Sequence, residues 1–195
     1  MTRSLLAILA AGILAAPAIS QTTVASINTY VKGIDRYARR APKVVFADVS
    51  DYENSRKAEW RKFASEKALE KHREASEAYS IAYAWSRGGR LVAANFTLFS
   101  PSGDWTKYVN HYFRSDGTLA KVEVDYRTFH GDFIVEQNIY YGPTGKLLRK
   151  TTAYKDLQTG KPKKPEAGYL DDNSDLLAGD IYKRIAKLPF AGLIK

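Results

Sequence analysis

Glycine recurs at one fixed interval through the middle of this chain. It occupies every fourteenth position from Gly89 onward, at Gly103, Gly117, Gly131 and Gly145. Glycine reaches the positive φ angles of tight hairpin turns without a Cβ clash. A unit of this length holds one strand and one turn, and it is too short for the helical crossover that joins parallel strands. The spacing therefore predicts an antiparallel meander.

β-Branched and aromatic residues fill the intervals between these glycines, as is typical of strands. They predict about six strands, over residues 78–86, 91–99, 105–113, 119–128, 132–141 and 146–154. Because the glycine interval is even, we expect each repeat position to keep one face, with even-numbered residues on the inner side and odd-numbered residues on the outer side.

Helices are predicted on both sides of the meander, so the fold class is α+β. Apolar residues at three- and four-residue steps predict a helix from Val24 to Ala38, and residues 43–48 predict a short strand at the sheet edge. Ser50 and Glu53 match a capping box and predict a helix to about residue 75. Residues 161–165 read as an extended linker, followed by a last helix that begins at residues 172–174 and is closed by Pro189. We expect a single domain over residues 21–195, with a helical part at 21–76, the meander at 77–155, and the linker and last helix at 156–195.

Residues 1–20 have the pattern of a cleavable secretion signal. Arg3 precedes an apolar run from Leu5 to Ala16, and Ala18 and Ser20 supply the small residues before the cut. The run is shorter than the roughly 20 apolar residues that span a bilayer. The pattern predicts a periplasmic or secreted protein that starts at Gln21 and has no transmembrane segment. The chain has no cysteine, so its fold needs no disulfide.

Positive charge exceeds negative charge, with 30 lysines and arginines against 21 acids. Residues 32–43 and 146–164 hold the surplus, which favours an anionic partner such as lipid headgroups or polysaccharide, although solubility alone also explains single lysines. Specific recognition of nucleic acid is not expected. The candidate contacts to an anionic partner are Arg36, Arg39, Arg40, Lys146, Arg149 and Lys150.

A ladder of tyrosines allows two interpretations: a core packed under helices, or a groove for an apolar or sugar ligand. Polar residues on the same predicted face support the groove, with Asn110, Val122, Asn138 and Lys150 expected side by side across the strands. The candidate groove residues are Tyr108, Asn110, Tyr112, Tyr126, Glu136, Asn138 and Tyr140.

Catalytic chemistry has no clear signature in this sequence. None of the usual nucleophile, phosphate-loop or zinc patterns occurs, and the three histidines do not stand at metal-ligand spacing on a predicted helix. We predict no catalytic residue, cofactor or metal. The leading function is an exported binding or structural protein that favours an anionic partner. One alternative is a carrier that encloses an apolar ligand or lipid between a curved sheet and a helix. Another is a hydrolase that uses His111 or His130 with nearby acids.

Residues 112–119 and 140–147 each place a tyrosine before a glycine turn and a leucine two residues after the glycine. These two units resemble the hairpins of bacterial repeat families such as the YwqK-type and MORN-type modules. The resemblance covers the hairpins only. It implies antiparallel hairpins and a binding role, and it assigns no functional residue.

Overall fold

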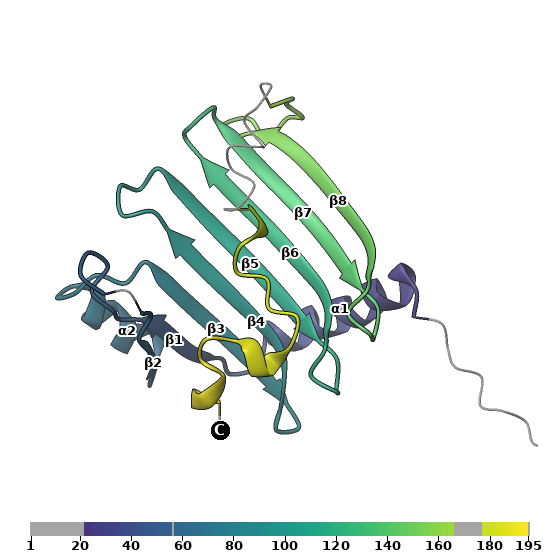
Figure 1. Cartoon of the computed structure of the whole chain (residues 1–195), viewed down its shortest axis with the longest axis horizontal. Coiled ribbons are helices and arrows are strands. Elements are labelled where there is room, and N and C mark those ends of the chain that lie inside the picture. Colours follow the sequence, from purple (N-terminus) through teal and green to yellow (C-terminus); the bar gives the residue numbers. More distant parts are fainter. Residues whose placement is uncertain (1–21, 56, 166–176, 195) are drawn as a thin grey trace, which may run out of the picture.

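An eight-stranded antiparallel sheet forms the centre of the described part of the chain, in a computed structural model that describes residues 22–55, 57–165 and 177–194 (Figure 1). The strands are β1 (Val44–Asp48), β2 (Trp60–Phe63), β3 (Ser80–Arg87), β4 (Arg90–Phe99), β5 (Trp105–Phe113), β6 (Leu119–Thr128), β7 (Phe133–Tyr141) and β8 (Leu147–Asp156). Their order is β2-β1-β3-β4-β5-β6-β7-β8. From β3 to β8, each strand pairs with its successor along the chain, which confirms the predicted meander. The predicted secretion signal lies outside the described residues.

The periodic glycines lie in the turns, as predicted. All five have positive φ, from 74° at Gly89 to 80° at Gly145. In the β5–β6 turn, the Gly117 N–H donates to the Arg114 carbonyl at 2.9 Å, and the Arg114 N–H donates to the Thr118 carbonyl at 2.8 Å. Glycine supplies the left-handed backbone that closes each of these turns.

From β4 to β8, the residues that share a face alternate between even and odd numbers from strand to strand, whereas β3 and β4 keep the same parity. This corrects the expectation of one even-numbered inner face. Tyr112 pairs with Lys121, and Lys121 pairs with Tyr140, so these three residues share a face. The exchange of parity comes from an even number of turn residues in the β4–β5 and β6–β7 hairpins. In the β5–β6 and β7–β8 hairpins it comes from an odd number of turn residues plus one bulge residue. Tyr126 and Tyr154 therefore lie on the opposite face from Tyr112 and Tyr140.

Helix α1 (Val24–Ala38) confirms the first helix prediction. The Thr23 hydroxyl accepts from the Ser26 N–H at 3.1 Å, and the Ser26 hydroxyl completes the capping box. The helix buries Ile27, Val31 and Ile34 against one face of the sheet, called here the helix face. In Figure 1, α1 lies behind the sheet.

The helix predicted from Ser50 to about residue 75 is wrong. This stretch contains β2 and the short helix α2 (Glu66–Arg73), whose cap is the Ser65 hydroxyl. The Asp48 side chain instead stabilises a reversal of the chain between β1 and β2. Its carboxylate accepts from the Ser50 N–H at 3.0 Å and from the Glu59 N–H at 2.8 Å. β2 therefore pairs with β1, and β1 is not the edge strand that the sequence predicted.

The last helix is confirmed only at Leu177 and Ala178 and is wrong from Gly179 onward, whereas its predicted start at residues 172–174 lies outside the described residues. Residues 179–194 form a strap without α-helix that contains two 3-10 turns, η1 (Ile185–Lys187) and η2 (Ala191–Leu193). This C-terminal strap pairs with the β5–β6 turn, where Leu119 N–H donates to the Lys183 carbonyl at 3.0 Å and Ile185 N–H donates to the Gly117 carbonyl at 3.1 Å. Figure 1 shows the strap in yellow, in front of the sheet.

The main hydrophobic core lies on the face beneath the strap, called here the strap face. Its buried sheet residues are Phe46, Ala82, Ala84, Leu91, Ala94, Phe96, Leu98, Val109, Phe113, Leu119, Val122, Val124, Ile139 and Tyr141. Phe190 of the strap is fully buried and stacks on Phe46, with ring centroids 4.4 Å apart. Lys107, also buried, reaches the Asp180 carboxylate at 2.9 Å. None of the described helices has the length and apolar character needed to cross a membrane.

Candidate functional site

Six of the seven predicted groove residues share the helix face of the sheet: Tyr108, Asn110, Tyr112, Glu136, Asn138 and Tyr140. The seventh, Tyr126, is buried on the strap face with Val135 and Leu177. The alternating parity of the strands is the reason for this separation.

A polar row crosses the helix face, one position away from the predicted row. Asn95, Asn110, Glu123, Asn138 and Thr151 stand opposite one another on β4 to β8. The Asn95 amide donates to the Asn110 side-chain oxygen at 2.8 Å. The row is half-buried, and of its members Asn110 lines a cavity of only about 80 Å³, too small for the predicted groove.

Two tyrosines of the predicted groove fasten α1 to the sheet. The Tyr112 hydroxyl lies 2.9 Å from an Asp35 carboxylate oxygen and 3.2 Å from a Glu123 oxygen, and the Tyr140 hydroxyl donates to the Asn28 side-chain oxygen at 3.0 Å. Burial and the two carboxylates raise the pKa of Tyr112, and burial raises the pKa of Asp35. Tyr112 and Tyr140 therefore position the helix and do not present a free surface.

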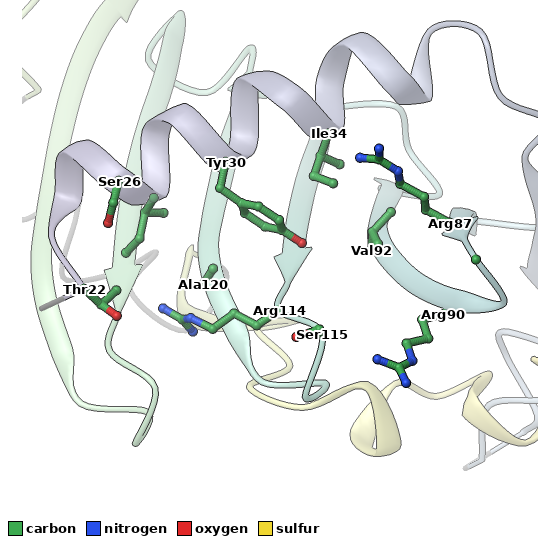
Figure 2. A pocket seen from close by; sticks show the side chains of 12 residues that line it. Thr22, Ser26, Tyr30, Ile34, Arg87, Arg90, Val92, Arg114, Ser115 and Ala120 are labelled. Atoms are coloured by element: carbon green, nitrogen blue, oxygen red, sulfur yellow. The ribbon is translucent and has the colours of Figure 1, made fainter. Parts of the chain in front are cut away.

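A pocket of about 580 Å³ opens between α1 and the turns that join β3 to β4 and β5 to β6 (Figure 2). It is lined by Thr22, Ser26, Ile27, Tyr30, Ile34, Arg87, Gly88, Arg90, Val92, Arg114, Ser115 and Ala120. Ile27 and Ile34 come from the buried stripe of α1, and Val92 and Ala120 come from the sheet. The pocket thus combines apolar walls with three arginines.

Bulges in the hairpins place two of the apolar wall residues. Val92 is an extra residue between the pairs Trp85–Ala93 and Ser86–Leu91, and Ala120 is an extra residue in the β5–β6 hairpin. A bulge redirects a side chain relative to the regular ladder. Both residues accordingly contribute to the pocket beneath α1, as Figure 2 shows.

No carboxylate among the described residues forms an ion pair with Arg87, Arg90 or Arg114. The Arg114 guanidinium donates to the Leu119 carbonyl at 2.5 Å and to the Tyr141 carbonyl. Burial lowers the pKa of Arg114. The charge of Asp116 acts on the Arg114 pKa in the direction opposite to burial. Carbonyl oxygens do not neutralise a guanidinium, and the described lining of the pocket holds three arginines and no acid, so the pocket keeps a positive potential.

Tyr30 spans the gap between α1 and the sheet inside this pocket. Its hydroxyl donates to the Phe113 carbonyl. Burial raises the pKa of Tyr30, while the charges of Arg114 and Arg87 act in the opposite direction. Both guanidinium groups therefore lie close enough to influence the interior of the pocket.

A second basic hollow of about 520 Å³ adjoins the pocket. It is lined by Gly33, Arg36, Tyr37, Arg40, Ala41 and Arg87, so the two hollows share Arg87. The Arg87 guanidinium lies 5.7 Å from the centre of the Tyr37 ring. Of the predicted contacts to an anionic partner, Arg36 and Arg40 are thus brought next to the pocket.

The other predicted anionic contacts lie elsewhere. Arg39 follows the last residue of α1 but does not line either hollow. Lys146, Arg149 and Lys150 belong to the β7–β8 hairpin, near the first turn of α1, where Tyr140 meets Asn28. Arg36 and Arg40 lie at the C-terminal end of α1, whereas these three residues lie near its N-terminal half. A 15-residue helix is about 22 Å long, so the predicted contacts form two separate groups and not one site.

The two histidines of the hydrolase alternative, His111 and His130, lie in different surroundings. His111 is fully buried, and its Nε2 accepts from the Tyr182 N–H at 3.2 Å. His130 is exposed in a turn, 3.9 Å from Asp104. Among the described residues, no group of three or more histidines and acids is placed to hold a metal ion.

Sequence reasoning missed Arg87, Arg90 and Arg114 because each is an isolated basic residue beside a turn. A signal was nevertheless present. Alternate turns of a meander lie at the same end of the sheet, so arginines beside Gly89 and Gly117, two repeats apart, must come close together.

No known protein family, curated protein or solved structure matches this chain. The α+β fold and the pocket define a sheet-and-helix domain with a cationic, partly apolar cavity. Its function must therefore be inferred from its own residues.

Proposed function

We propose that this protein is an exported, non-enzymatic binding protein whose pocket takes up an anionic amphiphile. The observation that supports this function is that one pocket is lined both by apolar side chains and by three arginines that form no ion pair with a described carboxylate. A carboxylate or phosphate headgroup pairs with the arginines, and the hydrocarbon tail lies against Ile27, Ile34 and Val92. The proposal unites the anionic-partner and carrier hypotheses drawn from the sequence.

The chemistry of arginine favours such a headgroup. The guanidinium group is always charged and can bind a carboxylate or phosphate through two parallel hydrogen bonds. Arg90 is exposed and has no ion pair with a described residue, so a ligand need not displace an internal partner. The pocket volume falls within the range of roughly 300–1,000 Å³ that is usual for small-molecule sites.

Calorimetric titration with dodecanoate and with dodecan-1-ol tests the proposal, because the two ligands differ only in the headgroup. We expect dodecanoate to bind about tenfold more tightly or better, since a hydrogen bond to a charged group contributes about 1.5–3 kcal/mol. Equal affinity for the two ligands, or no binding of dodecanoate, would contradict the proposal.

A pair of arginine variants sharpens this test. Arg90→Gln removes one pocket charge and should weaken dodecanoate binding about tenfold while leaving dodecan-1-ol unaffected. Arg39→Gln removes an exposed charge at the end of α1, outside the pocket, and should leave both affinities unchanged. Identical losses in the two variants would show that the effect is one of net charge and not of the pocket.

A further inference from the structure

Three hairpin turns gather at one end of the sheet, as Figure 1 shows for β3–β4, β5–β6 and β7–β8. The strap reaches the middle one of these turns, β5–β6, where Thr118 forms a bridge with Arg184. We call this the turn end; it comprises residues 86–91, 114–119, 141–150 and 183–187. Its basic residues are Arg87, Arg90, Arg114, Lys146, Arg149, Lys150, Lys183, Arg184 and Lys187, and its one acid is Asp116.

The opposite end of the sheet has a different charge. Its turns at residues 100–104 and 129–132 contain Asp104 and Asp132, and the cation that reaches them, Lys163, is paired with Asp156 at 3.5 Å. Unpaired positive charge is therefore denser at the turn end than at these two turns. A surface with one sign of charge attracts and orients a surface of the opposite sign.

Two leucines stand exposed within the cations of the turn end. Leu147 is 52% exposed and Leu148 is 42% exposed, and both follow Lys146 and precede Arg149 and Lys150 on β8. β8 is the last strand of the sheet. Adjacent leucines that remain in water between three cations are typical of segments that enter the interface of an anionic membrane.

Leu148 occupies the same structural position as two residues of the pocket. It is the extra residue of the bulge in the β7–β8 hairpin, between the pairs Tyr140–Arg149 and Tyr141–Leu147. The equivalent bulge residues are Val92 in the β3–β4 hairpin and Ala120 in the β5–β6 hairpin. Val92 and Ala120 are two repeats apart, and so are Ala120 and Leu148. The apolar row that lines the pocket thus reaches an exposed leucine at the edge of the sheet.

We propose that the turn end docks on an anionic lipid bilayer, with Leu147 and Leu148 inserted between the lipid chains and the surrounding cations paired with phosphates. Docking brings the pocket next to the bilayer, from which an amphiphile is taken or to which it is delivered. This inference goes beyond the proposed binding function. It shares Arg87, Arg90 and Arg114 with the pocket but depends chiefly on Leu147, Leu148 and the cations of β8, which do not line the pocket.

Cosedimentation with vesicles provides the first test. The protein should sediment with phosphatidylcholine vesicles that contain phosphatidylglycerol, should do so less at high salt, and should remain in solution with phosphatidylcholine alone. Equal sedimentation with both vesicles, or none with the anionic vesicles, would overturn the proposal.

Matched variants separate this surface from general charge and hydrophobicity. The double variant Leu147→Ser, Leu148→Ser and the triple variant Lys146→Gln, Arg149→Gln, Lys150→Gln should each weaken vesicle binding about tenfold or more. The controls are Phe129→Ser, at the opposite end and 69% exposed, and Lys161→Gln with Lys164→Gln, which are exposed beyond β8. Equal losses in variants and controls would contradict the proposed surface. Thermal unfolding midpoints identify any variant whose fold is disturbed.

The absence of cysteine from the sequence permits a direct measurement of insertion. An environment-sensitive nitrobenzoxadiazole label on Leu147→Cys should brighten and shift to the blue with anionic vesicles, whereas the same label on Phe129→Cys should not change. An unchanged label at position 147, or identical responses at both positions, would overturn the proposal.

Dodecanoate titration of the double leucine variant distinguishes docking from ligand binding. Docking predicts that this variant binds dodecanoate in solution like the unmodified protein while failing to bind vesicles. Vesicle binding by a protein that takes up no dodecanoate would refute the proposed pocket function and leave the docking surface supported.

Discussion

At the scale of single residues, His111 links the stability of the fold to pH. It lies on the strap face, with its ring 5.9 Å from that of Phe113 and 5.7 Å from that of Tyr182. Burial lowers the pKa of His111 from 6.5 to about 4, although Asp180 acts in the opposite direction. The unfolded state therefore binds more protons than the folded state between about pH 6.5 and 4. Stability must rise with pH through this window and level off above it.

This histidine gives a prediction for pH dependence. Between pH 7 and pH 4.5, its titration should remove about 2 kcal/mol of the free energy of unfolding. His111→Gln cannot titrate, so its stability should fall less over the same interval. Urea unfolding of both proteins at several pH values measures the difference in slope. Parallel profiles would show that His111 does not titrate as the structure predicts.

At the scale of elements, the C-terminal strap replaces a helix as the cover of the main core. Phe190 fits between Phe46, Phe96 and Trp60, with ring centroids 4.4, 5.5 and 5.5 Å away. The strap is also tied to the sheet by its hydrogen bonds to the β5–β6 turn. Phe190 is thus the most deeply buried side chain of the strap, and Leu188 is buried beside it in the same core.

Truncation of Phe190 should have a large effect. Phe190→Ala is expected to destabilise the protein by about 3–5 kcal/mol, because a large buried side chain is removed and leaves a cavity. Phe129→Ala, at an exposed site, should change stability by no more than about 0.5 kcal/mol. Chemical denaturation measures both values, and similar effects of the two substitutions would contradict the role assigned to the strap.

The elements also show how far sequence reasoning reaches in this chain. The meander was predictable because Gly103 and its counterparts must adopt positive φ, and α1 was predictable from its apolar stripe. The assignment of residues to faces was not predictable, because bulges in three of the hairpins, together with turn length, decide which residues share a face. The spacing of Ile181 and Ile185 predicted a helix, but both residues contact the core from the strap, which is not α-helical there. Ser50 was predicted to cap a helix, but its N–H donates to the Asp48 carboxylate in the loop that leads to β2.

At the scale of the whole molecule, charge and cavity lie at the same end of the sheet. The sequence identified the basic segments, and Arg36 and Arg40 do lie beside the pocket. The pocket itself depends on the approach of α1 to two turns that are separated by two repeats, which no local pattern records. The role of Leu148 was also not predictable, because its equivalence to Val92 and Ala120 depends on the bulge in the β7–β8 hairpin.

The central claim is that an anionic amphiphile binds between α1 and the sheet at the turn end. The most direct test is photo-crosslinking with a fatty acid that carries a diazirine near the end of its chain, followed by peptide mapping. We predict adducts on peptides from α1 and from the β3–β4 and β5–β6 hairpins, with loss of the adducts when unlabelled dodecanoate competes. Adducts confined to the strap or to the turns at the opposite end of the sheet would contradict the claim.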